Sequence, residues 1–442
     1  MARRGDKEKS RKHRVQDMTR ERMEFRQTEL GMLPEDWEVR PVKEVAGVNE
    51  RTINKDFEFR EIDYIDIDSV ENGIINNIQH LKLSEAPSRA KRIVKKYDII
   101  ISTVRPNLKH FALVKEARPN TIVSTGFAVI SSKKIEPKFL YYYLTTNKVT
   151  DYLTAIADSH TSTYPSFNPG VIENSLVPYP IEVEQQSIAK ALSDLDSKIE
   201  LNQQMNKKLE EIGRLIFKRW FVDFEFPNEE GKPYKSSGGE MAYNEDLGRE
   251  IPKGWSVADL SDEFKLVMGQ SPPGTSYNES GDGVVFFQGR ADFGIRFPAT
   301  RMYTTEPTRF AKKRDTLVSV RAPVGDINLA LQDCCIGRGL AAIRHKSSSM
   351  SYTYYSMLTL KPVFDNFEAE GTVFGSISKV NFERIKIVAA PDKIVNFFES
   401  VVNPFDRKIE ENTLQIQTLS SIRDSLLTKL MSGKIRVPVE AK

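Results

Sequence analysis

The 442-residue sequence has little cysteine, little histidine and no long apolar run. Its two cysteines, Cys334 and Cys335, are adjacent, and this spacing suits neither metal ligation nor a structural disulfide, so we expect two small buried residues of a strand. No stretch approaches the roughly 20 apolar residues of a membrane helix. The N-terminus, rich in Arg and Lys, lacks the apolar core of a signal peptide. These absences predict a cytoplasmic protein without membrane contact.

The common catalytic motifs are also absent. The five histidines lack metal-ligand or triad spacing. Gly231-Lys232 has no glycine at the spacing that a phosphate-binding loop needs. We therefore expect no catalytic residue, no metal site and no bound cofactor, and a binding and scaffolding role. A nuclease with a site assembled from distant residues, and a two-domain adaptor that binds proteins, remain open alternatives.

The net charge of +3 is too small to indicate nucleic-acid binding by itself. A DNA-binding face would have to come from segregated charge. The most basic segment, residues 1–30, has little aliphatic periodicity and is predicted to be a solvated tail.

What the chain does contain is an internal duplication. Trp37 and Trp255, each three residues after a proline, stand 218 residues apart, and the string that begins Asp196-Ser197-Lys198-Ile199 returns at Asp406 after 210 residues. A chain of this length exceeds one hydrophobic core. The duplication predicts two similar domains in a pseudo-twofold arrangement, which suits a nearly twofold partner such as DNA.

Each copy shows the same order of short apolar runs, each followed by an aromatic helix start. The runs lie at 64–67, 97–102 and 128–130 in the first copy and at 284–287, 315–320 and 340–343 in the second, with helix starts at 139 and 352. These patterns predict an α+β fold with two mixed α/β domains. The expected divisions are a tail (1–30), a first domain (31–180), a central helix (181–226), a linker (227–247), a second domain (248–390), a C-terminal helix (391–435) and a tail (436–442).

Each copy ends in a long amphipathic helix with heptad spacing. The predicted seam includes Leu195, Ile199 and Asn202 in the first helix and Phe405, Ile409 and Asn412 in the second. The two helices would pair with each other as an antiparallel coiled coil. At about 1.5 Å per residue the first would be about 50 Å long, on the order of 15 base pairs. Whether the two asparagines are buried and fix the register, or face solvent, stays open.

Clustered cations and polar loop residues give the candidates for DNA contact, because cations neutralise phosphates and Arg, Asn and Gln reach base edges. In the first copy these are Arg89, Lys91, Arg92, Arg105, Asn107 and Lys109. In the second they are Tyr277, Asn278, Gln288, Arg290, Arg296, Lys312, Lys313 and Arg321.

Several sequence motifs resemble those of a known protein family. They are Gly269-Gln270-Ser271-Pro272-Pro273-Gly274, the run from Ser319 to Gly325, the run from Cys335 to Ala341, Trp220-Phe221-Val222-Asp223-Phe224, and the run from Leu426 to Gly433. Together with the two tryptophan openings, they resemble the specificity subunit of a type I restriction-modification system. The likeness spans nearly everything after the N-terminal tail and is looser in the first half.

The resemblance implies two target-recognition domains, each of which reads one half of a split, asymmetric DNA site. It also implies that the helices set the unread spacer and bind two methyltransferase subunits, and that ATP-dependent restriction subunits join the complex. S-adenosylmethionine, ATP and Mg²⁺ would then belong to these partner subunits and not to this chain.

Overall fold

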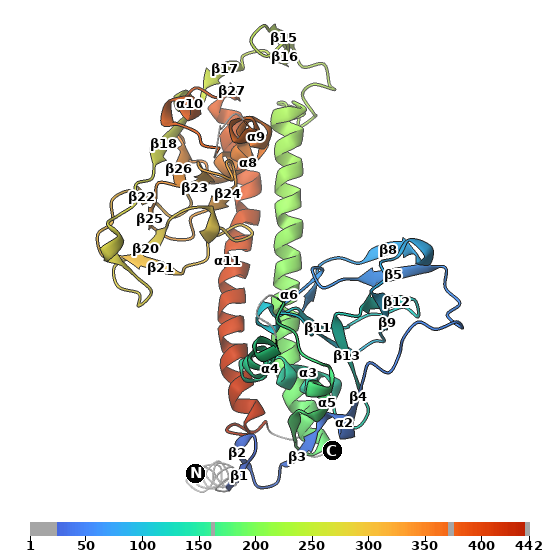
Figure 1. The fold of residues 1–442 in the computed structure, drawn as a ribbon. Coiled ribbons are helices and arrows are strands. Elements are labelled where there is room, and N and C mark those ends of the chain that lie inside the picture. Colours follow the sequence, from blue (N-terminus) through green and yellow to red (C-terminus); the bar gives the residue numbers. More distant parts are fainter. Residues whose placement is uncertain (1–23, 161–163, 370–374, 438–442) are drawn as a thin grey trace, which may run out of the picture. The chain divides into compact units, whose positions relative to one another are not determined.

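The computed structural model describes residues 24–160, 164–369 and 375–437 (Figure 1). The chain forms two compact units, of which unit 1 comprises Met1–Ile199 with Gln417–Lys442 and unit 2 comprises Glu200–Ile416. Each unit combines one β-rich domain with parts of two long helices, α6 (Glu182–Phe217) and α11 (Asp392–Met431). Most of the predicted basic tail, residues 1–30, lies outside the described residues.

The first domain is built on two four-stranded sheets, in the strand orders β11-β10-β13-β4 and β8-β5-β12-β9. Its strands are β1 (Phe25–Thr28), β2 (Gly31–Pro34), β3 (Glu38–Pro41), β4 (Ala46–Val48), β5 (Glu61–Ile65), β6 (Val70–Glu71), β7 (Ile74–Ile75), β8 (Gln79–Lys82), β9 (Ala90–Ile93), β10 (Ile99–Ser102), β11 (Phe111–Leu113), β12 (Thr121–Ser124), β13 (Phe127–Ser132) and β14 (Leu176–Tyr179). Its helices are α2 (Val42–Val45), α3 (Pro137–Leu144), α4 (Asn147–His160) and α5 (Gly170–Asn174).

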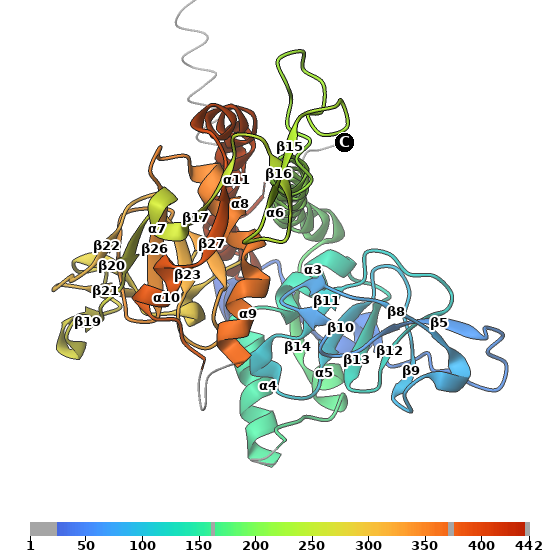
Figure 2. The ribbon, with the colours of Figure 1, turned by 90° about the horizontal axis from the view of Figure 1, so that it is seen from above.

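The second domain repeats this plan, with the orders β24-β23-β26-β18 and β19-β21-β20-β25-β22. Its strands are β15 (Met241–Asn244), β16 (Arg249–Pro252), β17 (Ser256–Asp259), β18 (Phe264–Met268), β19 (Tyr277–Asn278), β20 (Val284–Phe287), β21 (Met302–Thr304), β22 (Phe310–Ala311), β23 (Thr316–Ser319), β24 (Ile327–Leu329), β25 (Cys334–Ile336), β26 (Leu340–His345) and β27 (Lys386–Ala389). Its helices are α7 (Leu260–Glu263), α8 (Met350–Thr359), α9 (Lys361–Ala369) and α10 (Lys379–Glu383). Figure 2 shows the strands of each domain from above.

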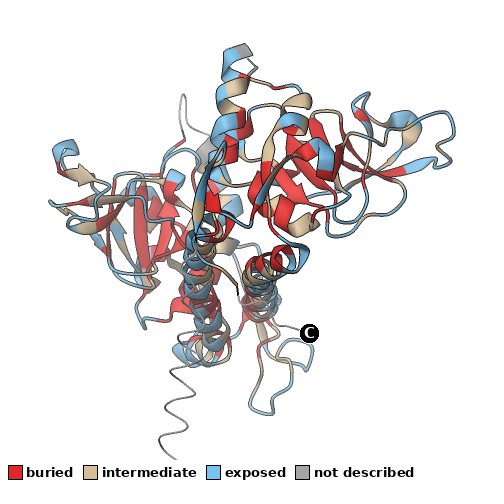
Figure 3. Ribbon diagram, turned by 90° about the horizontal axis from the view of Figure 1, so that it is seen from below, coloured by how far each residue is buried: buried red, intermediate tan, exposed pale blue. Residues whose placement is uncertain are grey.

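The shared strand order confirms the duplication. Strands β10 and β23 each carry consecutive apolar residues, because successive side chains of one strand point to opposite faces and both faces are covered. Ile99 and Ile101 belong to the core beside the helices, whereas Ile100 belongs to a second core between the sheets. In unit 2, Val318 likewise belongs to the core beside the helices, and Leu317 belongs to the core between the sheets. Figure 3 shows these buried strands in red. Cys334 and Cys335 lie buried in β25, as predicted.

The long helices form the predicted seam, and they are antiparallel where both contribute to unit 2. Asn202 of α6 donates a hydrogen bond to Gln415 of α11 at 2.7 Å, and Asn206 accepts one from Asn412 at 2.9 Å. Asn202 and Asn412 are both buried, so the structure decides the question that their spacing left open. Ile199 and Ile409 are buried as well, whereas Leu195 and Phe405 are partly buried.

The helix ends differ from the predicted boundaries. Helix α6 ends at Phe217 and passes into one π-helical turn, Lys218–Val222, while α11 ends at Met431. Residues at or after each helix end pack against the tryptophan at the start of a domain. Trp255 packs against Phe221, Phe224 and Phe226, while Trp37 is covered by Arg436. The predicted linker, 227–247, contains strand β15, because this strand pairs with β16 in a hairpin.

Candidate nucleic-acid interface

The ends of several strands meet at one edge of unit 2. Phe287 of β20 lies beside Ile336 of β25 in a parallel pair, so both strands end together. Ser319 at the end of β23 pairs with Leu340 at the start of β26, and β26 also pairs with the end of β18. The loops that leave these strands therefore gather in one region, although they are far apart in sequence.

This region carries an excess of positive and amide side chains, and we call it the second polar edge. Its members, all of them exposed, are Gln270, Gln288, Arg290, Arg309, Arg321 and Arg338. Arg290 donates from Nε to Oδ2 of Asp326 at 2.7 Å. Among the described residues, Arg321 and Arg338 have no ion-pair partner. An accessible arginine of this kind can bind a phosphate or donate two hydrogen bonds to a guanine.

Glycines bring these loops together. A Cβ on Gly337 or Gly339 would meet the carbonyl oxygen of Gln288 at 2.9 or 2.8 Å, closer than side chains allow. The amide of Gly339 donates to that same carbonyl, and Gly339 in turn accepts from the amide of Val320. The sequence Gly337-Arg338-Gly339 thus holds Arg338 beside the loops of Gln288 and Arg321.

Unit 1 has a comparable edge, which we call the first polar edge. Its members are the exposed Arg89, Arg105 and Tyr164, with the partly buried Gln79 at the start of β8. The amide of Thr125 donates to the carbonyl of Arg89 at 2.8 Å, just as the amide of Ile336 donates to that of Arg309, so these two arginines are structural equivalents. The Arg105 guanidinium lies 5.6 Å from the centre of the Tyr164 ring, which is 69% exposed.

Arg105 and Arg321 are not equivalent, although both follow the same strand. Val104 forms a bridge with Ser166, and Arg321 forms the corresponding bridge with Ser376. Val104 is therefore the structural equivalent of Arg321, and Arg105 is the equivalent of Ala322. Arg105 also has a φ of 46°, in the left-handed region. The offset of one residue and the left-handed backbone at Arg105 therefore direct the two arginine side chains differently.

Other predicted contact residues lie away from the polar edges. Lys312 and Lys313 stand at the opposite end of β23, where the amide of Lys312 donates to Asp315. The Nζ of Lys313 lies 2.6 Å from Oε1 of Glu410 on α11. Together with Arg314, Lys313 holds the pKa of Glu410 below its ordinary value, in opposition to the effect of burial. Lys313 therefore joins the second domain to its helix.

The remaining predicted contact residues of unit 1 differ in how accessible their side chains are. Lys91 and Asn107 are exposed, while Arg92 is partly buried in β9 and burial lowers its pKa. Lys109 donates from Nζ to Asn147 of α4 at 3.0 Å.

Tyr277 and Asn278 have structural roles around strands β19, β20 and β21, where β21 pairs with both of the others. The hydroxyl of Tyr277 donates to the carbonyl of Pro272 at 3.0 Å, and its ring centre lies 4.8 Å from that of Phe286. The side chain of Asn278 donates to the carbonyl of Asp282 and accepts from the Asp282 amide, which closes the following turn. Their polar groups are thus already used within the domain.

The prediction of DNA contact for Arg296 is wrong. Its side chain is 3% exposed, and Nη2 lies 2.5 Å from Oδ1 of Asp406, which is fully buried on α11. The sequence could not reveal this, because Arg296 stands in the same loop as Arg290, which lies six residues earlier and is exposed.

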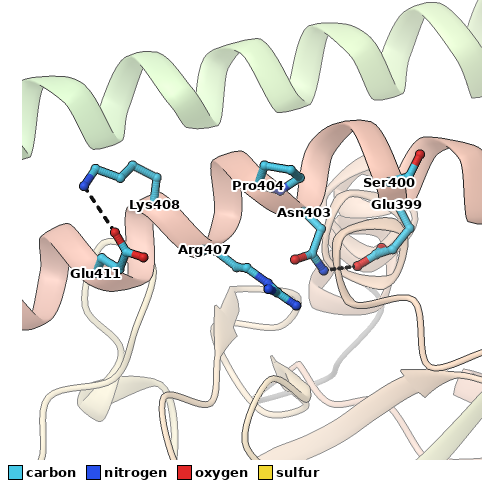
Figure 4. A pocket seen from close by; sticks show the side chains of 7 residues that line it. All are labelled: Glu399, Ser400, Asn403, Pro404, Arg407, Lys408 and Glu411. Carbon is cyan, nitrogen blue, oxygen red and sulfur yellow. Dashed lines mark hydrogen bonds and ion pairs between the residues drawn. The ribbon is translucent and has the colours of Figure 1, made fainter.

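A shallow hollow of about 530 Å³ lies along α11 in unit 2 and is lined by that helix alone (Figure 4). Several of its polar groups are already paired. Asn403 donates to Glu399, which also accepts from the amides of Ser351 and Tyr352 at the start of α8, and Lys408 pairs with Glu411. Within the described ranges, no cluster of acidic, histidine or cysteine side chains could hold a metal ion.

Residues 34–211 match the family model described as "Type I restriction modification DNA specificity domain". The chain is also 32% identical over 429 residues to the putative type I restriction enzyme MjaX specificity subunit of Methanocaldococcus jannaschii, a match that covers 93% of this chain and 97% of that one. The chain belongs to the type I restriction enzyme specificity subunits.

A second relative, the MjaIX specificity subunit of the same organism, is 28% identical and covers 94% of this chain and 97% of its own. A solved structure titled as the S subunit of a type I system from M. genitalium has a TM-score of 0.58 at 16% identity, covering 89% of this chain and 96% of that one. That likeness confirms the fold. The specificity subunit is the non-catalytic component that determines DNA recognition, so the expected non-enzymatic role is confirmed. No described helix is long and apolar enough to cross a membrane.

Five residues of the specificity subunit's polar edges were not among the predicted contacts: Gln79, Tyr164, Gln270, Arg309 and Arg338. Arg309 and Arg338 are visible in the sequence, as a cation before a short strand and as the arginine between two glycines. Tyr164 had no sequence signal, because only the fold brings it beside Arg105.

Proposed function

We propose that each domain of this specificity subunit reads one half of a split, asymmetric DNA site through its polar edge. The observation that carries the proposal is the duplicated edge itself, where strand ends in the same order bring arginines and amides together. The edges differ in composition and register, as in the offset between Arg105 and Arg321, so the two half-sites would differ in sequence.

The paired helices would set the unread spacer between the half-sites. Their buried asparagines favour a single register, since any slip would leave amides unpaired. The outer face of α6 supports docking of a modification subunit, because Leu201, Ile212 and Leu215 are at least 42% exposed and lie on one side of the helix.

By family membership, two methyltransferase subunits and ATP-dependent restriction subunits complete the complex. The binding of S-adenosylmethionine, ATP and Mg²⁺ is assigned to those subunits. A cytoplasmic location follows from the same assignment and remains a prediction.

Exchange of residues 248–390 for those of a relative with a different target tests this function. Adenine-methylation mapping in cells that contain the complex should show that one half-site switches while the other half and the spacer stay constant. A simultaneous change in both halves would reject independent reading.

An insertion in α6 after Asn202 tests the spacer. We expect a longer gap between unchanged half-sites, and changed half-sites at a constant gap would contradict it.

The two competing functions are tested by separate experiments. Cleavage of DNA by the purified chain with a metal ion alone would indicate a nuclease, and a methylation pattern that survives deletion of the chain would indicate a protein adaptor.

A further inference from the structure

A buried arginine joins the second domain to its helix. Arg296 lies in the loop after β20, and its guanidinium contacts Asp406 of α11 at 2.5 Å. The hydroxyl of Tyr355 donates to the same carboxylate oxygen at 3.1 Å, and the guanidinium carbon lies 4.2 Å from the centre of the Tyr354 ring. Burial alone would lower the pKa of Arg296, but Asp406 and the two tyrosines raise it, so the arginine stays charged.

Stability alone does not account for this ion pair. Removing two charges from water is costly, and a buried pair is often no more stabilising than apolar residues of the same size. Among the described residues, Nε of Arg296 and Oδ2 of Asp406 have no hydrogen-bond partner. What the pair does provide is a fixed geometry, because the planar guanidinium accepts few orientations between the carboxylate and the ring.

The loop that Arg296 anchors leads directly to the second polar edge. Arg290 stands six residues before it, and Gln288 eight. Between them, Gly294 exchanges two hydrogen bonds with the side chain of Asn328, and the carbonyl of Arg296 accepts from Leu329. A shift of Arg296 would thus move a short, tightly held segment whose other end presents Gln288 and Arg290.

The equivalent carboxylate in unit 1 is held differently. Asp196 accepts from Tyr142 at 2.6 Å, as Asp406 does from Tyr355, but its arginine is Arg423 of α11, at 2.9 Å. The arginine of unit 1 therefore comes from a helix, and that of unit 2 comes from a recognition loop.

A glycine explains why unit 2 takes its arginine from a loop. The residue of α6 that corresponds to Arg423, at the 210-residue repeat, is Gly213. A Cβ there would meet the hydroxyl of Tyr355 at 2.2 Å, so an arginine at this position would clash with Tyr355.

We propose that the Arg296–Asp406 contact is a positioning device that sets how accurately the second domain reads its half-site. The proposal rests on the proposed function, because it requires each domain to read its own half. Arg296 itself touches no DNA. It acts by fixing the loop that carries Gln288 and Arg290.

The test uses the complete specificity subunit assembled with its modification subunits. Methylation rates are measured on the target duplex and on duplexes with one base changed in either half, for the variants Arg296→Met, Arg296→Lys and, as the matched control, Arg423→Met. For Arg296→Met we expect discrimination at the second half-site to fall at least tenfold, with the first half-site within twofold of wild type. For Arg423→Met both should stay within twofold.

Arg296→Lys keeps the charge without the planar fork, and a smaller loss in the same half-site is expected. It also serves as the test if Arg296→Met does not assemble. Wild-type discrimination by the assembled Arg296 variants, or an equal loss in both half-sites, would overturn the proposal. The exchange of residues 248–390 is run in parallel, and if it fails to switch one half-site, the proposed function itself is wrong whatever the Arg296 variants show.

Discussion

Asn412 of α11 donates a hydrogen bond from its side-chain amide to Oδ1 of Asn206 in α6, at 2.9 Å, inside the helix seam of unit 2. The amide of Asn206 in turn faces Thr413 at 3.3 Å. A chain of polar groups therefore crosses an otherwise apolar contact, which costs stability but favours one register.

Removing one member of this pair should destabilise the protein. We expect Asn412→Ala to lower the free energy of unfolding by about 1–3 kcal/mol, because it leaves the Asn206 carbonyl without its donor. Replacing both Asn206 and Asn412 by Leu should restore or exceed wild-type stability. Urea unfolding followed by circular dichroism measures both variants, and a double variant less stable than the single one would contradict this account.

The C-terminal segment should contribute strongly to unit 1. Arg436 pairs with Asp36 and with Glu184, which is buried and also accepts from the indole of Trp37. Burial raises the pKa of Glu184 despite these partners. We expect Arg436→Met to cost about 3–5 kcal/mol, because an unpaired buried carboxylate remains.

The control for Arg436 is Lys190→Met, since Lys190 and Asp194 form an exposed pair within α6. Such pairs contribute about 0–1 kcal/mol. Thermal unfolding should separate the two variants clearly, and similar losses would show that the Arg436 contacts are not specially stabilising.

Arginines of the second polar edge should read bases, whereas the lysine at the far end of β23 should not. We expect Arg338→Ala or Arg321→Ala to weaken target binding by about 1–3 kcal/mol and to relax discrimination at one position. Lys312→Ala should change neither by more than about twofold. Fluorescence anisotropy of the assembled complex on labelled duplexes decides this, and equal effects at both ends of the strand would reject the assignment.

Stability should depend on His345 below neutral pH. This residue is buried between Phe264 and Tyr352, with Nε2 3.3 Å from Glu263, and burial lowers its pKa below the usual value despite that carboxylate. The unfolded state then binds the proton more readily, so the stabilisation is complete above about pH 6.5 and is lost as the pH falls towards the lowered pKa.

Substitution His345→Gln should flatten that part of the profile, because it removes the titrating group. Melting temperatures between pH 7.5 and 5 measure the slope. An unchanged slope in the variant would assign the acid sensitivity to other groups.

Much of the fold could be predicted from the sequence, because the relevant signals are local or repeated. The runs at 284–287 and 340–343 became strands at nearly the expected bounds, and heptad spacing placed Ile199, Asn202, Ile409 and Asn412 in a seam. Repetition of the tryptophan openings predicted two similar domains, and the two β-rich domains of the structure agree with that number.

The site depended on contacts between distant segments. The sequence could not show that Arg290, Arg296 and Lys313, three cations of one domain, have different environments. The fold turns Arg290 towards the polar edge, buries Arg296 against Asp406 and pairs Lys313 with Glu410. Local pattern determined the strands, the helices and the duplication, since each follows from periodicity along the chain. Only the tertiary structure decided which charges remain accessible, because that depends on which strand ends meet and on which carboxylates lie opposite.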